Sequence, residues 1–108
     1  MAQDADFVNY VLDQLQGLGD LETKNMFGGV ALLRDGAAFG KIKHDRFWLK
    51  ADDENRQDFL DRGMPQYTYG KDNSRTLNFF ATPSEVLEDR DQLQTWARRS
   101  MAAATRTQ

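Results

Sequence analysis

The single histidine of the chain, His44, stands directly before a carboxylate, Asp45, and this pair is the first place to look for chemistry. A histidine beside a carboxylate can act as a general base. The sequence assigns no serine or threonine to it as a nucleophile, and such a pair in a polar stretch is more typical of a solvated turn. We therefore assign no catalytic residue. A small-molecule or enzymatic role around His44-Asp45, or around Tyr67 and Tyr69, is kept as the last of three hypotheses.

Residue types that hold metal ions or cofactors are scarce. The chain has no cysteine, which excludes thiolate-dependent zinc and iron–sulfur sites. The acidic run Asp52-Asp53-Glu54 lacks both the alternating spacing of a calcium loop and a histidine partner, so it predicts a helix start. Gly28-Gly29 lacks the lysine and Ser/Thr of a phosphate loop; we interpret it as a tight lead into a strand, with Met26 and Phe27 in the core. The sequence therefore predicts no metal site and no cofactor.

Charge is unevenly distributed along the chain. Residues 1–22 contain five acidic residues and no Lys or Arg, whereas residues 23–50 contain six Lys or Arg and two Asp. A basic sheet face that also carries an aromatic ring can bind phosphates and stack a base. The net charge of −3 favours instead an ordinary solvated face, or an edge protected by lysines. Direct nucleic-acid binding is the second hypothesis, with the candidate contacts Lys41, Lys43, Arg46, Trp48 and Lys50.

The spacing of apolar residues predicts the elements that position these side chains. Residues 4–17 place apolar side chains at helical intervals and predict a first helix. Asp35-Gly36 between two apolar runs is the strongest short hairpin signal, and it predicts strands at 30–33 and 37–43. A third strand at 46–50 follows His44-Asp45. In this arrangement Lys41 shares a strand face with Lys43, and Trp48 shares one with Lys50.

The second half of the chain predicts three further helices and a second hairpin. The segment Thr82-Pro83-Ser84-Glu85 has the order of a capping box with proline at the first helical position. Gly63 and Pro65 stop the helix that precedes the hairpin. The expected elements are a helix at 52–62, strands at 66–70 and 76–81, a helix from Pro83 and another from Asp89 or Asp91, with residues 104–108 frayed.

The order of these elements predicts an α+β fold, with an antiparallel sheet of about five strands and helices packed on one face. The other face is then open to partners. A length of 108 residues fits a single domain spanning 1–108. The acidic start lacks the pattern of a signal peptide, and no apolar run approaches the roughly 18 to 20 residues of a membrane helix. We therefore expect a cytoplasmic protein that binds no membrane.

Several short motifs follow one another in an order that is specific only when they are taken together. The most specific are Met-Phe-Gly-Gly at 26–29 and Asp-Glu-Asn-Arg at 53–56. The others are Arg34-Asp35-Gly36, Phe39, Phe47 with Leu49-Lys50, Phe59, Gly63, Tyr67-Thr68-Tyr69, Pro83 with Glu85-Val86-Leu87, and Trp96-Ala97-Arg98-Arg99. This set resembles the N-terminal domain of the TfoX/Sxy competence regulators, from about Phe7 to Ala103. The chain is identified as a short stand-alone member of that family.

The resemblance implies a bacterial α+β regulatory domain without a known catalytic site. The family is linked to DNA uptake and to transcriptional activation alongside a cyclic-AMP receptor protein, and its long members carry a second, C-terminal helical domain. Asn55 and Arg56 match a family motif at the exposed start of a helix beside Lys50, which makes them candidate partner contacts. The alternative is structural: Arg56 pairs with a nearby acid, and Asn55 satisfies backbone groups at the turn into the helix.

The first hypothesis is therefore a non-enzymatic, cytoplasmic regulatory module that acts by binding another protein. The resemblance makes the transcription machinery the expected class of partner. We expect a monomer or a weak homodimer, because an exposed sheet edge can self-associate.

Overall fold

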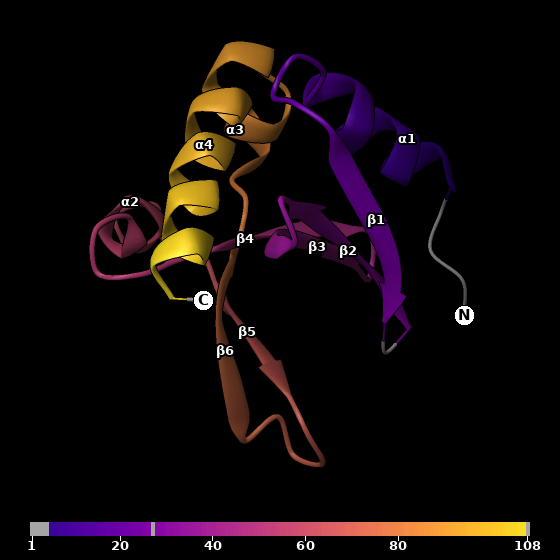
Figure 1. Ribbon diagram of the computed structural model, residues 1–108. Helices are drawn as coiled ribbons and strands as arrows, with labels where there is room; N and C mark the ends of the chain where they lie inside the picture. Colours follow the sequence, from indigo (N-terminus) through magenta and orange to yellow (C-terminus); the bar gives the residue numbers. More distant parts are fainter. Residues whose placement is uncertain (1–4, 27, 108) are drawn as a thin grey trace.

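The structure is a computed structural model that describes residues 5–26 and 28–107, and these residues form four helices and a six-stranded sheet (Figure 1). The helices are α1 (Ala5–Gln14), α2 (Arg56–Leu60), α3 (Ser84–Leu87) and α4 (Arg90–Arg106). The strands are β1 (Leu21–Met26), β2 (Gly29–Arg34), β3 (Ala37–Lys43), β4 (Arg46–Lys50), β5 (Gln66–Tyr69) and β6 (Arg75–Ala81). None of these helices has the length and apolar character needed to span a bilayer.

All neighbouring strands are antiparallel, in the order β1-β2-β3-β4-β6-β5, so β1 and β5 form the two edges. The predicted fold class is confirmed, but the sheet has six strands where about five were expected. The strand that the sequence did not predict is β1. Its residues, Leu-Glu-Thr-Lys-Asn-Met, do not alternate between apolar and polar, because as an edge strand it buries little of its surface.

Tight turns join β2 to β3 and β3 to β4, as the sequence predicts. Asp35 and Gly36 have φ values of 53° and 81°, and His44 and Asp45 have 56° and 57°. Positive φ at both central residues is the hallmark of the two-residue hairpin turn whose twist matches that of the strands. At Gly29 the reason for glycine is closeness: a Cβ there would lie 2.8 Å from the backbone oxygen of Ile42.

The helices cover one face of the sheet, as expected. α4 packs across β3 and β4, and α1 and α3 pack beside α4. Between these layers lies the main core, in which the Phe59 ring stacks on Phe80 with centroids 5.4 Å apart and meets Trp96 edge-on at 5.0 Å. The opposite face carries no helix among the described residues, and we call it the open face.

Three expectations about the helices need correction. α2 is a short helix that follows a turn at residues 53–55, not a helix from residue 52 to 62. Thr82 does not cap α3, because its hydroxyl donates to the Phe47 carbonyl at 2.9 Å. Residues 104–106 are not frayed, since α4 continues to Arg106 and Ala104 is buried in the main core. The predicted start of α4 is confirmed: the Asp89 carboxylate accepts from the Gln92 N–H at 3.1 Å.

Candidate binding site on the open sheet face

A β-bulge in β3 sets which of its side chains reach the open face. The pairing of β2 with β3 runs Leu32 to Gly40 and then Leu33 to Ala38, so Phe39 is an extra residue. Phe39 and Ile42 therefore both point into the main core, although a regular strand would place them on opposite faces. Lys41 and Lys43, on either side of Ile42, are left together on the open face, half-buried.

The open face has a small apolar cluster of its own. Trp48, Tyr67, Phe79 and Ala81 are buried there, with Leu77 packed against them. The Trp48 ring meets the Tyr67 ring edge-on at 5.0 Å, and its indole N–H donates to the Lys43 carbonyl at 3.3 Å. The face is therefore a packed aromatic surface. One row of paired residues crosses it from edge strand to β6: Lys24, Ala31, Lys41, Trp48 and Ala81.

Lysine ammonium groups cover the aromatic rings of this cluster. Lys41 Nζ lies 4.5 Å from the Tyr67 centroid, and Lys43 Nζ lies 5.8 Å from it. Lys50 Nζ lies 5.2 Å from the centroid of Phe79. Each contact is the geometry of a cation–π interaction, worth about 0.5–1 kcal/mol at an exposed site. Lys41 shares a face with Lys43, and Trp48 shares one with Lys50, as predicted; the pairing of Lys41 with Trp48 puts both pairs on the open face, where Trp48 itself is only 8% exposed.

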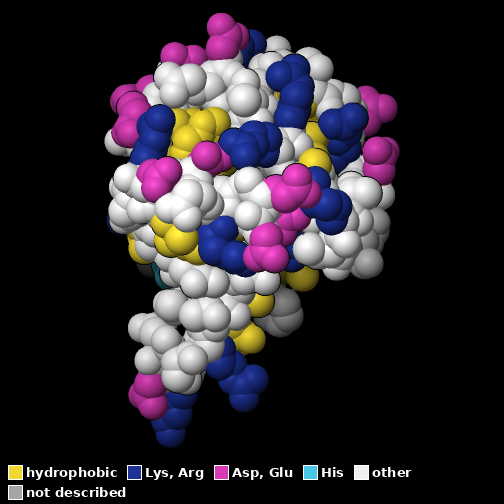
Figure 2. Space-filling view, turned by 90° about the vertical axis from the view of Figure 1, so that its left-hand side faces the viewer, with side chains coloured by type: hydrophobic (Ala, Val, Ile, Leu, Met, Phe, Trp, Pro, Cys, Tyr) yellow, Lys and Arg dark blue, Asp and Glu magenta, His cyan; other side chains and the backbone are white. Residues whose placement is uncertain are grey.

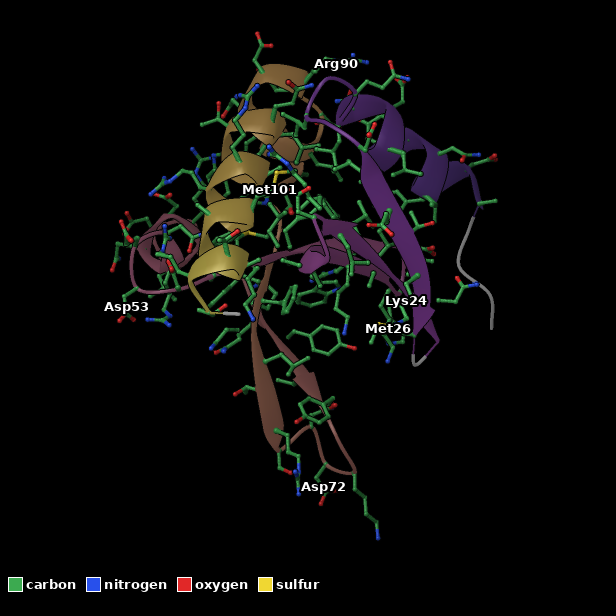
Figure 3. The ribbon with its side chains drawn as sticks, in the orientation of Figure 1. Lys24, Met26, Asp53, Asp72, Arg90 and Met101 are labelled. Atoms are coloured by element: carbon green, nitrogen blue, oxygen red, sulfur yellow. The ribbon has the colours of Figure 1, made fainter. Side chains whose placement is uncertain are left out.

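A groove of about 530 Å³ opens on this face, and we call it the sheet groove. Met26 was expected in the core; it is instead 38% exposed, because it follows Lys24 by two residues on an edge strand and so lies on the open face. Phe27, expected beside it in the core, lies outside the described residues. Figure 3 shows Lys24 and Met26 near the end of β1, on the side toward the β5–β6 hairpin. The groove is lined by Met26, Lys41, Lys43, Tyr67, Tyr69 and Leu77.

The candidates for enzymatic chemistry are brought together only in part. A neighbouring cavity of about 430 Å³ is lined by His44, Tyr67 and Tyr69 among others, so His44 lies near both tyrosines. Asp45 lines a different cavity of about 370 Å³, together with Arg46. The two members of the His44-Asp45 pair thus face different cavities, from a turn in which both are exposed.

The corner that carries Asn55 and Arg56 is held by internal bonds. Asn55 was expected at an exposed helix start, but the structure buries it, with only 3% of its surface exposed. Its side-chain oxygen accepts from the Asp52 N–H at 2.8 Å, and its amide nitrogen donates to the Lys50 carbonyl at 3.0 Å. The Arg56 guanidinium pairs with Asp53 at 2.7 Å. These contacts match the structural alternative, in which Asn55 satisfies backbone groups and Arg56 pairs with an acid.

Ion pairs to α4 account for the acidic run before α2. Arg106 Nε lies 2.6 Å from Asp52 and 3.1 Å from Glu54, and Arg99 pairs with Asp58. The hydrogen bond from Arg106 lowers the pKa of Asp52. Figure 2 shows this side of the molecule, where basic and acidic side chains are interspersed. Among the described residues, no three histidine or carboxylate side chains gather to hold a metal ion.

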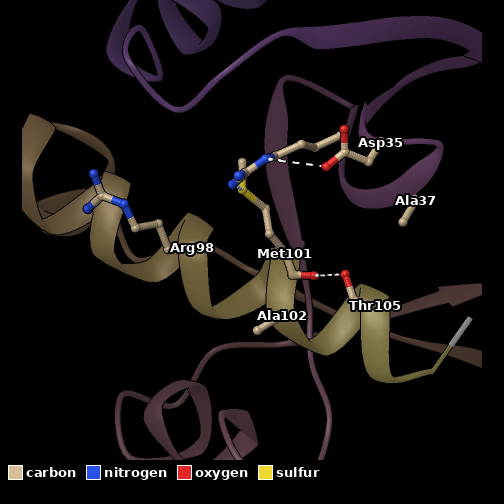
Figure 4. A pocket seen from close by; sticks show the side chains of 7 residues that line it. Asp35, Ala37, Arg98, Met101, Ala102 and Thr105 are labelled. Atoms are coloured by element: carbon tan, nitrogen blue, oxygen red, sulfur yellow. Dashed lines mark hydrogen bonds and ion pairs between the residues drawn. The ribbon is translucent and has the colours of Figure 1, made fainter.

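A smaller cavity lies between the β2–β3 turn and α4 (Figure 4). Its volume is about 270 Å³. Arg34 crosses it, donating from Nη1 to the Met101 sulfur at 3.1 Å, with Nε 4.0 Å from Asp35. Arg98 also lines it, from α4. The bond between Arg34 and Met101 ties the hairpin to the helix, which is a structural role.

Sequence reasoning found the lysines of the sheet groove and named both tyrosines, but it missed Met26 and Leu77 as lining residues. The alternation of Leu77, Phe79 and Ala81 along β6 was the available signal, since one face of that strand is apolar. The structure places Lys50, Arg46 and Arg56 outside the sheet groove.

The amino-acid sequence was compared with models of known protein families and with curated proteins. The model of the TfoX N-terminal domain family matches residues 13–104 of this chain. A comparison with curated proteins gives no match. The family match includes every strand, α2 and α3, and most of α4. The chain therefore belongs to the TfoX N-terminal domain family.

Proposed function

We propose that the protein is a non-enzymatic, cytoplasmic regulatory module that binds another protein in the sheet groove. The observation that carries the proposal is the groove itself: an apolar hollow lined in part by two lysines, on a face that carries no helix among the described residues. Two of the four exposed large hydrophobic side chains of the described residues, Met26 and Tyr69, line it. An exposed apolar patch of this kind marks an interaction site.

The chemistry around His44 supports a binding role over catalysis. A general base needs a partner that orients it and a substrate site within hydrogen-bond reach. Asp45 lines a different cavity from His44, and among the described residues no hydrogen bond or ion pair is found between the two side chains.

Nucleic-acid binding is the second candidate, favoured by the lysines that share the open face. Lys24 and Lys41 lie in one cross-strand row, and Lys43 lies two residues farther along β3, so the face offers several ammonium groups for phosphate contacts. Base stacking has less support, because Trp48 is buried and lysines already cover Tyr67 and Phe79. Binding that rests on phosphates alone falls steeply with salt.

Family membership supports a regulatory role, and the transcription machinery is the class of partner to test first. A photo-crosslinking amino acid placed at Tyr69 in living cells tests the site. Tyr10 is the matched control, since it is also a tyrosine and both are 39% exposed, but it lies on α1. We expect a discrete protein adduct from position 69 that Lys43→Glu reduces, and none from position 10. Equal adducts from both positions, or none from position 69, would contradict the proposal.

A fluorescently labelled duplex distinguishes the second candidate. Its anisotropy is measured with the protein at about 50 and about 200 mM salt. Saturable binding that weakens steeply with salt and is lost in Lys41→Glu would favour nucleic acid. Unchanged anisotropy at both salt concentrations is the result that the protein-binding proposal expects.

A further inference from the structure

The sheet groove lies between the two edges of the sheet. β1 and β5 are at opposite ends of the strand order, yet Met26 of β1 and Tyr69 of β5 line the same hollow. The sheet therefore curls, so that its open face is concave. In Figure 1 the β5–β6 hairpin and the end of β1 extend away from the central strands on the same side, and β5 lies on the side of the hairpin nearer β1.

One border of the groove offers an unpaired strand edge. Among the described strands β1 pairs with β2 alone, over six residues and without a register shift. The pairing of β5 with β6 is irregular between Gln66 and Thr68, and β5 has four residues. A long and regular edge is the better template for an added strand, because its outward N–H and C=O groups repeat without interruption along the strand. β1 is therefore the edge that an extended segment would join.

The positive charge of the two lysines that line the groove favours an acidic occupant. Every ion pair found among the described residues uses an arginine, so Lys41 and Lys43 have no carboxylate partner there. Their ammonium groups rest over Tyr67 instead. A segment that carries carboxylates beside apolar side chains complements both the lysines and the apolar lining residues Met26, Tyr69 and Leu77.

We infer that the groove binds an extended, acidic peptide segment of a partner protein, which adds to β1 as a strand and places apolar side chains in the hollow. The inference rests on the proposed function and specifies the partner's chemistry. Six residues of extended chain span about 20 Å, so β1 can pair with a segment of that length. A second copy of this chain, bound by the same edge, is the competing occupant.

A labelled peptide of glutamates around two leucines is the probe, and fluorescence anisotropy gives its Kd. We expect saturable binding that weakens about tenfold or more in Lys43→Glu and in Tyr69→Ala. Lys50→Glu is the matched control: it makes the same charge change on the open face, outside the groove, and is expected to bind within about twofold of the unchanged protein. Equal weakening by Lys50→Glu would mean that the overall charge of the face binds the peptide, and would overturn the inference.

Backbone methylation of the peptide tests strand addition separately. Two peptides are N-methylated at alternate residues, one at odd and one at even positions. In an added strand the N–H groups point alternately toward β1 and away from it, so only one of the two peptides is expected to lose binding. Equal binding of both would contradict pairing with β1.

The remaining outcomes separate this inference from the proposed function. If no acidic peptide binds while position 69 still forms its adduct in cells, the extended-segment inference fails and the protein-binding function stands. If both fail, both are wrong. Concentration-dependent dimerisation that Tyr69→Ala abolishes, without peptide binding, would identify a second copy as the occupant and overturn the inference.

Discussion

Replacing Asn55 with alanine tests whether this motif residue is structural. Its side chain is 3% exposed and bonds two backbone groups, the Asp52 N–H and the Lys50 carbonyl. A hydrogen bond contributes about 0.5–1.5 kcal/mol net, and a buried group left without a partner costs about 1–3 kcal/mol. Because both bonds are partly buried, we expect Asn55→Ala to lose about 2–4 kcal/mol of unfolding free energy.

Urea unfolding followed by tryptophan fluorescence and by circular dichroism measures this loss. In a separate thermal scan, the melting temperature should fall by about 10 °C or more, since 1 kcal/mol corresponds to about 4–8 °C in a domain near this size. Gln57→Ala is the matched control, because its side-chain amide donates to the exposed Asp61 carboxylate at 2.7 Å and, within residues 5–26 and 28–107, to no other group. That variant should stay within about 0.5 kcal/mol of the unchanged protein.

A small loss of unfolding free energy in Asn55→Ala would refute the structural role of this residue. If Asn55→Ala loses less than about 1 kcal/mol, the two bonds do not hold the corner between β4 and α2. If it also loses partner binding while stability is unchanged, then Asn55 is a contact residue, as the family resemblance first suggested, and the structural interpretation is wrong.

Three further predictions concern stability. Arg106 lowers the pKa of Asp52 from its usual 3.8, so the ion pair stabilises the folded state above that pH and its contribution is lost as pH falls through the lowered pKa. Asp52→Asn should therefore be less stable than the unchanged protein at pH 7, with a difference that shrinks in urea titrations toward pH 3; a constant difference would contradict it. Gly29→Ala should lose about 1–3 kcal/mol, because its Cβ would lie 2.8 Å from the Ile42 oxygen, and a variant of unchanged stability would mean that the strands can separate without cost. Ser100→Ala should gain about 1 kcal/mol in the same assay, since the buried hydroxyl has no hydrogen-bond partner among the described residues; a loss would show that it has one.

The elements with strong local signals could be predicted from the sequence. Asp35-Gly36 gave the first hairpin, and Asp89 gave the start of α4, because each signal depends on backbone geometry within a few residues. The faces of β4 also followed from alternation, which placed Trp48 and Lys50 together. Such interactions are local, so the residue types at those positions are enough to indicate them.

The parts that depend on distant contacts could not be predicted. β1 forms because it pairs with β2, although its own residues carry no strand pattern. The bulge at Phe39 is visible only in the register of two strands. Residues 104–106 stay helical through contacts with the main core and with Asp52, which lies far away in sequence. The sheet groove combines four strands and needs the curl of the whole sheet.

Mapping the bound surface by amide chemical shifts tests the central claim most directly. Isotope-labelled protein is titrated with the acidic peptide, and the shifted amides are located on the structure. The account predicts shifts confined to the residues that line the sheet groove and to the amides of β1. Shifts gathered instead on the α2–α4 side, around Arg99 and Arg106, would contradict it.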